Sequence, residues 1–184
     1  MRRLASLFAA VLLLAGCGAG GPYRDTSVPI SSAAAFDPER YTGLWYEIAR
    51  FPVPFQSGCV VATARYGALS DGRLSVVNTC RDGSPDGAVR QIQGDARVTG
   101  PGRLSVGFTT VPLVRAPYWV LWVDEGYRTA VVGVPSGRAG WILNRSPHIP
   151  ADRLRAALEV LEFNGYDVEK LIYSAQAPRA RSAR

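Results

Sequence analysis

Histidine and lysine are almost absent from this sequence, because His148 and Lys170 are the only residues of their kinds. A single histidine excludes a multi-histidine metal site within one chain, and any Ser-His-Asp triad would depend on His148. No glycine-rich phosphate-binding loop precedes a helix. The single histidine and the missing phosphate-binding loop predict neither a metal ion nor a cofactor. The N-terminal apolar run is too short to cross a bilayer as a helix.

The N-terminus carries a basic pair, an apolar run and small residues. Arg2 and Arg3 precede Leu4–Leu14, which leads into Leu14-Ala15-Gly16-Cys17. This order is typical of a secretory signal peptide. The sequence predicts a signal peptide over residues 1–16, and its removal leaves 168 residues.

The string that ends in Cys17 resembles the lipobox of bacterial lipoproteins, whose cysteine is acylated and begins the mature chain. The resemblance implies lipidation of Cys17, for example with palmitate; an ordinary signal peptide cleaved nearby is the alternative. Several acyl chains on one cysteine hold a protein stably at a membrane, because each buried CH₂ contributes about 0.8 kcal/mol. Gly18 stands where an aspartate commonly signals inner-membrane retention. We therefore expect an outer-membrane protein, lipid-anchored and facing the periplasm.

The position of the charges matters more than their total. The chain has 184 residues, with 21 Lys and Arg against 15 Asp and Glu. That excess alone would favour nucleic acid or an anionic membrane as a partner. Without the predicted signal peptide and the basic tail over residues 177–184, only 16 basic residues face 15 acidic ones. This balance predicts no nucleic-acid partner, and we expect the tail to be disordered.

Two further cysteines, Cys59 and Cys80, lie 21 positions apart across a predicted hairpin. A chain directed to an oxidising compartment favours a disulfide between them. Closing a loop of this length stabilises a fold by about 3 kcal/mol in the chain-entropy model. Neither a metal site nor a nucleophilic cysteine is favoured, because the partner residues are missing.

The composition and patterning of the sequence change at Phe36. Residues 17–35 comprise the predicted acylated cysteine and a flexible tether rich in Gly, Ser, Ala and Pro. Residues 36–176 show short apolar-rich runs separated by turn residues, which predicts one all-β domain. The expected strands are Leu44–Phe51, Cys59–Tyr66, Arg73–Cys80, Val89–Val98, Arg103–Phe108, Tyr118–Asp124, Arg128–Val134 and Trp141–Arg145. Eight strands with short connections predict an antiparallel up-and-down β-barrel, because closure removes the exposed edges.

One segment has helical periodicity instead. Between Ala151 and Phe163, apolar residues recur at helical spacing, and Gly165 stands where a helix C-terminus is expected. The segment predicts an amphipathic helix packed on the outside of the barrel. Lys170–Ala175 then predicts a short closing strand.

Three motifs resemble those of the lipocalin family, and in particular the bacterial outer-membrane lipocalins related to apolipoprotein D. Gly43-Leu44-Trp45 matches the first motif, Asp124-Glu125-Gly126-Tyr127 matches the turn of the second, and Arg145 matches the arginine of the third. The resemblance runs from about Phe36 to Ala175. It implies an eight-stranded barrel in which Gly43, Trp45, Asp124, Tyr127 and Arg145 identify the fold.

We expect Trp45 and Arg145 to stabilise the closed end of such a barrel. If both side chains point inward, the guanidinium can stack on the indole face and contribute on the order of 0.5–2 kcal/mol. Strand alternation places Trp141 and Leu143 on the same face as Arg145 and leaves Ile142 outside, where the helix can cover it.

The same alternation predicts the residues that face the interior. An apolar cup lined by aromatic and aliphatic side chains suits an acyl chain, with a Tyr hydroxyl or Trp N–H for a polar end. Tyr118 and Trp141 are the strongest candidates, although the opposite face of the Tyr118–Asp124 strand is also apolar and leaves its orientation open. The predicted ligand-binding residues are Tyr118, Trp141, Val120, Trp122, Leu143, Glu47 and Ala49. In the related bacterial proteins the implied ligands are fatty acids and lysophospholipids.

The sequence thus predicts a non-enzymatic outer-membrane lipoprotein that binds, stores or transports lipophilic ligands. One alternative is a lipid-modifying enzyme on the same fold, for which Glu47 is the candidate and no partner is evident. A pairing of Ser57 with His148 is disfavoured, because His148 falls near the predicted closed end. A structural envelope lipoprotein with a filled barrel is the other alternative. Homodimerisation is left open.

Overall fold

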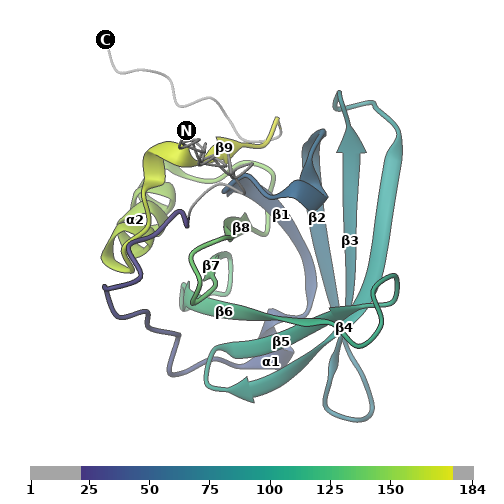
Figure 1. Cartoon of the computed structure of the whole chain (residues 1–184), viewed down its shortest axis with the longest axis horizontal. Coiled ribbons are helices and arrows are strands. Elements are labelled where there is room, and N and C mark those ends of the chain that lie inside the picture. Colours follow the sequence, from purple (N-terminus) through teal and green to yellow (C-terminus); the bar gives the residue numbers. More distant parts are fainter. Residues whose placement is uncertain (1–21, 176–184) are drawn as a thin grey trace, which may run out of the picture.

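The computed structural model describes residues 22–175, which fold around one closed β-sheet (Figure 1). The predicted signal peptide, the lipidation site Cys17 and the tail over residues 177–184 lie outside the described residues. No helix within residues 22–175 has both the length and the apolar character needed to cross a membrane.

Eight antiparallel strands pair with their neighbours along the chain, and β1 also pairs with both β2 and β8, which closes the barrel. A short ninth strand, β9, extends the sheet beside β1. The strands are β1 (Gly43–Arg50), β2 (Cys59–Ala68), β3 (Leu74–Asp82), β4 (Val89–Gly100), β5 (Arg103–Phe108), β6 (Arg115–Val123), β7 (Thr129–Gly133), β8 (Gly140–Asn144) and β9 (Ile172–Tyr173). The eight-stranded antiparallel barrel predicted from the sequence is confirmed.

The helices lie at the ends and on the outside of this barrel. The short helix α1 (Pro38–Tyr41) precedes β1, and α2 (Ala151–Phe163) packs against β6 and β7 (Figure 1). Two single-turn 3₁₀ helices, η1 (Pro54–Gln56) and η2 (Val168–Lys170), follow β1 and α2. The external helix is therefore confirmed, but the predicted strand over Lys170–Ala175 shortens to β9 because η2 occupies its beginning.

The hydrophobic residues form two cores on opposite sides of the barrel wall. The inner core fills the closed end and includes Trp45, Leu104 and Val120. The outer core lies beneath α2 and contains Ile142, as expected, together with Leu161 of the helix. A sheet with both faces covered explains why several strands are apolar on both sides.

Two β-bulges reverse the expected alternation. Between Glu47 and Ala49 of β1 the register with β8 shifts, and Ala49 packs in the outer core. Between Val120 and Trp122 of β6 the register with β7 shifts, and Trp122 packs beside the outer core. The prediction that Ala49 and Trp122 face the interior is therefore wrong, because an extra residue in a strand moves later side chains to the other face.

The segment over residues 22–35 lies against the barrel and does not form the flexible tether predicted from its composition. Arg24 is buried, and its guanidinium donates to the carbonyls of Pro135, Asn164 and Val28. Ala33 donates its backbone N–H to the carbonyl of Val120 at 2.8 Å. Backbone bonding and one buried arginine hold a segment whose composition alone suggested a linker.

Candidate functional site

The barrel encloses a largely apolar cavity of about 290 Å³. Its closed end lies at the start of β1, where α1 covers the barrel. Its open end, which we call the mouth, is surrounded by the loops over residues 51–58, 83–88, 109–114 and 134–139. Apolar wall residues include Ala62, Val76, Ile92, Val106 and Phe108. Such a space is suited to the hydrocarbon part of a ligand.

Four of the predicted ligand-binding residues line this cavity: Tyr118, Trp141, Leu143 and Glu47. Val120 faces the interior, as predicted, but it is fully buried in the inner core and does not line the cavity. Ala49 and Trp122, which were predicted to line the cavity, lie on the outer face of the barrel wall. The rings of Tyr118 and Trp141 stack at 6.2 Å, so the two strongest candidates form one surface.

Glu47 belongs to a buried polar network near the mouth. Its carboxylate accepts hydrogen bonds from Arg50 at 2.8 Å, from Gln56 at 2.7 Å and from Ser174 at 3.1 Å. Gln56 also accepts a bond from the indole N–H of Trp141 at 2.9 Å. The network ties η1 to the wall of the cavity, and it pairs the buried carboxylate with a cation.

Three tyrosines from different elements meet at the floor of the cavity. Tyr66 on β2 and Tyr118 on β6 line it, and Tyr41 at the end of α1 lies fully buried in contact with both. The hydroxyls of Tyr41 and Tyr66 each lie 2.9 Å from that of Tyr118. Burial raises the pKa of Tyr66 to about 12 and raises the pKa of Tyr118 and of Tyr41 well above the ordinary value. All three phenols therefore stay neutral at physiological pH.

Below the tyrosines, Arg145 seals the closed end. Its guanidinium carbon lies 3.8 Å from the ring centroid of Trp45, which confirms the predicted stacking. It also donates to the carbonyls of Leu44 and Tyr127 at 2.9 and 3.1 Å. Gly43 has a φ of 95°, and a Cβ there would lie 3.1 Å from the guanidinium. Glycine therefore meets both the conformational and the steric demand at this position.

Asp124 and Tyr127 form the tight connection between β6 and β7. The Asp124 carboxylate accepts the backbone N–H groups of Arg128 and Thr129 at 2.5 and 2.7 Å. Although partial burial acts to raise it, the pKa of Asp124 is lowered by these bonds and by the Arg128 guanidinium. Tyr127 adopts a left-handed φ of 52°, and its hydroxyl accepts the N–H of Asp37 at 2.7 Å. These residues shape the closed end and do not contact the cavity.

Sequence reasoning missed several residues that line the cavity, including Gln56, Tyr66, Asn78 and Phe108. Alternation within the predicted strands could have found Tyr66, Asn78 and Phe108 once one inward residue per strand was known. Gln56 lies in a loop and carries no such signal. Asn78 is notable because its Oδ1 is buried without a hydrogen-bond partner among the described residues.

The disulfide between Cys59 and Cys80 is confirmed and lies at the cavity wall near the mouth. Their Cα atoms are 5.5 Å apart on the neighbouring strands β2 and β3. Within residues 22–175, no group of three or more His, Cys, Asp or Glu side chains gathers in a way that could hold a metal ion.

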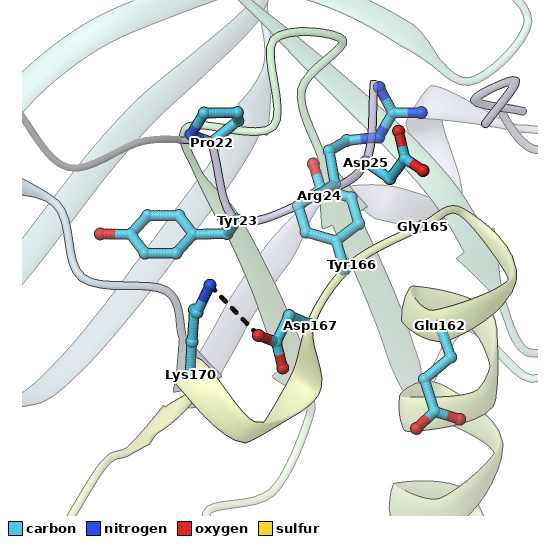
Figure 2. A pocket seen from close by; sticks show the side chains of 9 residues that line it. All are labelled: Pro22, Tyr23, Arg24, Asp25, Glu162, Gly165, Tyr166, Asp167 and Lys170. Carbon is cyan, nitrogen blue, oxygen red and sulfur yellow. Dashed lines mark ion pairs between the residues drawn. The ribbon is translucent and has the colours of Figure 1, made fainter. Parts of the chain in front are cut away.

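A second hollow lies outside the barrel, between the beginning of the described chain and the segment after α2 (Figure 2). Lys170 and Asp167 point toward each other across it and form an ion pair at 3.1 Å (Figure 2). Tyr23 lies beside them and donates its hydroxyl to the carbonyl of Pro52 at 2.7 Å. Several charged side chains line this hollow, which makes it the weaker candidate for an apolar ligand.

An up-and-down β-barrel of eight strands, closed at one end and hollow inside, defines the class of small barrels that enclose a ligand cavity. A family model described as Lipocalin-like domain matches residues 36–176. The chain belongs to the lipocalin family.

The relatives agree with this assignment. Outer membrane lipoprotein Blc of Escherichia coli is 36% identical over 169 residues, which cover 91% of this chain and 92% of that protein. Apolipoprotein D of Mus musculus is 35% identical over 152 residues, covering 77% and 78% of the two chains. Among solved structures, insecticyanin from the tobacco hornworm Manduca sexta superposes with a TM-score of 0.66 at 20% identity, covering 84% of this chain and 87% of that one. This last similarity concerns the fold alone.

Proposed function

We propose that this lipocalin is an outer-membrane lipoprotein that binds, stores or transports lipophilic molecules in its barrel, without chemical conversion. The observation that carries the proposal is the apolar cavity of about 290 Å³ between the tyrosine floor and the mouth. The acyl chains of fatty acids and lysophospholipids suit such an apolar space, because each CH₂ moved there from water contributes about 0.8 kcal/mol. The free energy gained by a long chain offsets the cost of ordering it.

The position of Tyr23 supports an anchor beside the mouth. Tyr23 bonds through its hydroxyl to Pro52 and through its N–H to Gly137, and both partners belong to loops around the mouth. The proposed acylated residue, Cys17, is only six positions earlier in the sequence. A chain extends at most about 3.3–3.6 Å per residue, so lipidation of Cys17 would keep the mouth close to the membrane surface.

The mouth itself is rich in exposed apolar side chains. Phe55 on η1 is 64% exposed, and Leu113 in the loop before β6 is fully exposed with a left-handed φ of 71°. Val111 and Val114 of the same loop are also exposed. Such side chains favour loading of the cup from a lipid environment. The similarity to the E. coli outer membrane lipoprotein supports the proposed location.

The alternatives receive less support from the site. Glu47, the candidate catalytic acid, is bonded to Arg50, Gln56 and Ser174, and His148 is exposed on the loop after β8, away from the cavity. The cavity argues against a barrel filled by its own side chains. Dimerisation of the lipoprotein is open to measurement by light scattering.

Lipid titration tests the proposal. The protein used is the chain from Cys17 onward, carrying Cys17→Ser to prevent acylation. Titration with fatty acid or lysophospholipid should quench its tryptophan fluorescence saturably. Trp141→Ala should weaken this binding, because Trp141 forms part of the cavity wall, while the melting curve shows a folded protein. Trp119→Ala is the matched control, since Trp119 packs beside the outer core. Absence of saturable binding to any lipid would overturn the proposal.

Fractionation tests the anchor separately. The full-length protein should sediment with outer-membrane vesicles, and Cys17→Ser should remove it from that fraction. Mass analysis of the N-terminal peptide should show acylation on Cys17. An unmodified cysteine in membrane-isolated protein would contradict the lipoprotein assignment without affecting the lipid-binding proposal.

A further inference from the structure

The hydroxyl groups of Tyr41, Tyr66 and Tyr118 at the cavity floor carry three donor protons but make only two hydrogen bonds. Tyr66 donates to Tyr118, while the bond between Tyr41 and Tyr118 can run in either direction. Three O–H groups therefore share two hydrogen bonds, and no other partner contacts them within residues 22–175. One proton is left for another acceptor.

Burial decides which of the tyrosines is left with an O–H group that has no acceptor in the protein. If Tyr118 donated to Tyr41, the proton of Tyr41 would lack an acceptor, although the Tyr41 side chain is fully buried. An unpaired buried donor costs free energy, which disfavours that direction. In the other direction Tyr41 and Tyr66 both donate to Tyr118, which then points its own O–H elsewhere. Because Tyr118 lines the cavity and Tyr41 does not, a ligand in the cavity can accept that proton.

The arrangement makes Tyr118 a stronger donor than an isolated phenol. Each hydrogen bond that Tyr118 accepts polarises its hydroxyl and strengthens the bond that it donates. The raised pKa keeps the phenol protonated, so the donor is present throughout the physiological range. The wall around it is largely apolar, so few protein groups compete for the proton of Tyr118.

We propose that the Tyr118 hydroxyl donates a hydrogen bond to an oxygen at the inner end of a single-chain amphiphile, whose hydrocarbon tail runs toward the mouth. This inference rests on the proposed function and specifies its ligand class as fatty acids and fatty alcohols. Their polar ends are small enough to lie on the floor. A carboxyl group can lie there as the neutral acid, because burial favours its protonated form. A phosphocholine group is larger and permanently charged, and it would be buried there without sufficient partners.

The polar groups near the mouth do not offer an equivalent site. Glu47 and Gln56 are bonded to each other, and Gln56 is bonded to Trp141 as well. Arg90 at the rim pairs with Asp82 at 3.1 Å. These groups already have partners in the protein, whereas the proton of Tyr118 has none among the described residues.

The orientation can be tested on the wild-type barrel with dodecanoic acid labelled with ¹³C at both the carboxyl and the terminal methyl carbon. A water-soluble paramagnetic agent should broaden the methyl signal, which lies toward the mouth, and spare the carboxyl signal at the floor. The two ends of one molecule serve as controls for each other. Stronger broadening of the carboxyl signal, or equal broadening of both, would overturn the proposed orientation while leaving lipid binding established.

A single hydroxyl deletion provides the second test. Tyr118→Phe should weaken binding of dodecanoic acid about tenfold, since one hydrogen bond to an otherwise dry oxygen is lost. It should leave unchanged the affinity for a lysophosphatidylcholine with the same dodecanoyl chain, whose headgroup stays at the mouth. Tyr173→Phe on β9 is the matched control and should change neither affinity, because Tyr173 is 48% exposed and lies outside the cavity.

The outcomes separate the two proposals. An unchanged affinity of Tyr118→Phe for dodecanoic acid overturns the Tyr118 contact, and so does an equal loss for both lipids, which would indicate a structural role. If Tyr118→Phe does not fold, the labelled-ligand experiment on the wild-type protein decides alone. Failure of the wild-type protein to bind either lipid overturns the proposed function as well.

Discussion

At the scale of single residues, two arginines at opposite ends of the barrel each bind several acceptor groups. Arg145 stacks on Trp45 and donates to three backbone carbonyls at the closed end. Arg50 pairs with Glu47 and donates to the carbonyl of Cys59 near the mouth. A planar guanidinium with five donors can satisfy several acceptors at once, which a lysine ammonium cannot reproduce.

Removal of the Arg145 side chain should destabilise the protein. Arg145→Ala loses the stacking on Trp45 and leaves the carbonyls of Leu44 and Tyr127 without their donor. We expect the free energy of unfolding to fall by about 2–4 kcal/mol, measured by urea denaturation. Arg155→Ala is the control, because Arg155 is exposed on α2 and should change stability by less than about 0.5 kcal/mol. Equal effects of the two substitutions would contradict the role assigned to Arg145.

The tyrosine floor predicts a loss of stability in alkaline solution. The pKa of Tyr66 is about 12 in the folded protein against an ordinary value of 10.0, so the unfolded chain releases this proton at lower pH. The resulting contribution to stability is complete below about pH 10 and is lost as the pH rises toward 12. Tyr41 and Tyr118 shift in the same direction.

Denaturation midpoints measured across this range should therefore decrease above pH 10 in the wild-type protein. Tyr66→Phe should show a shallower decrease, because phenylalanine has no proton to release. A wild-type midpoint that stays constant through pH 12 would show that the tyrosines titrate normally.

At the scale of elements, α2 stabilises the barrel from outside. Ala157 and Leu161 of the helix are fully buried against the outer core, while Phe163 at its end is 75% exposed. Gly165 adopts a left-handed φ of 83° just after the helix, as is common at helix C-termini. The helix covers strand faces that would otherwise expose Val131 and Ile142.

Truncation of the buried leucine should separate packing from simple loss of hydrophobicity. Leu161→Ala should lower the free energy of unfolding by about 2–5 kcal/mol, since it removes contacts and leaves a cavity beneath the helix. Phe163→Ala removes a larger side chain but should cost less than about 0.5 kcal/mol, because that side chain is mostly in water. Thermal or urea denaturation measures both, and a larger effect for Phe163→Ala would refute this account of the packing.

At the scale of the whole molecule, the disulfide connects two strands that form part of the cavity wall. Cys59 and Cys80 close a loop that contains the hairpin of β2 and β3. An oxidising compartment such as the proposed periplasmic location would allow this bond to form and persist.

Loss of the disulfide should lower stability while preserving the fold. We expect the double variant Cys59→Ser and Cys80→Ser to reduce the free energy of unfolding by about 3 kcal/mol, chiefly because the unfolded chain gains freedom. Denaturation of oxidised wild-type protein with and without reductant provides the comparison, and reductant should not affect the double variant. An unchanged midpoint after complete reduction would contradict the prediction.

The sequence by itself determined the class of the fold and the residues that identify it. Gly43, Trp45 and Arg145 were recognised by their resemblance to lipocalin motifs, and the steric and stacking contacts in the structure explain why those residue types are required. The number of strands, the helix and the disulfide also followed from periodicity, turn residues and cysteine spacing. These features depend on short-range patterns that survive in a one-dimensional sequence.

Only the tertiary structure decided which residues share the cavity. Bulges in β1 and β6 moved Ala49 and Trp122 to the outer face, and nothing in local composition marks an extra residue in a strand. The convergence of Tyr41, Tyr66 and Tyr118 depends on closure of the barrel, because each belongs to a different element. Likewise, one buried guanidinium holds residues 22–35 against the barrel through carbonyls more than 100 positions away. Such long-range contacts arise only when the whole sheet has closed.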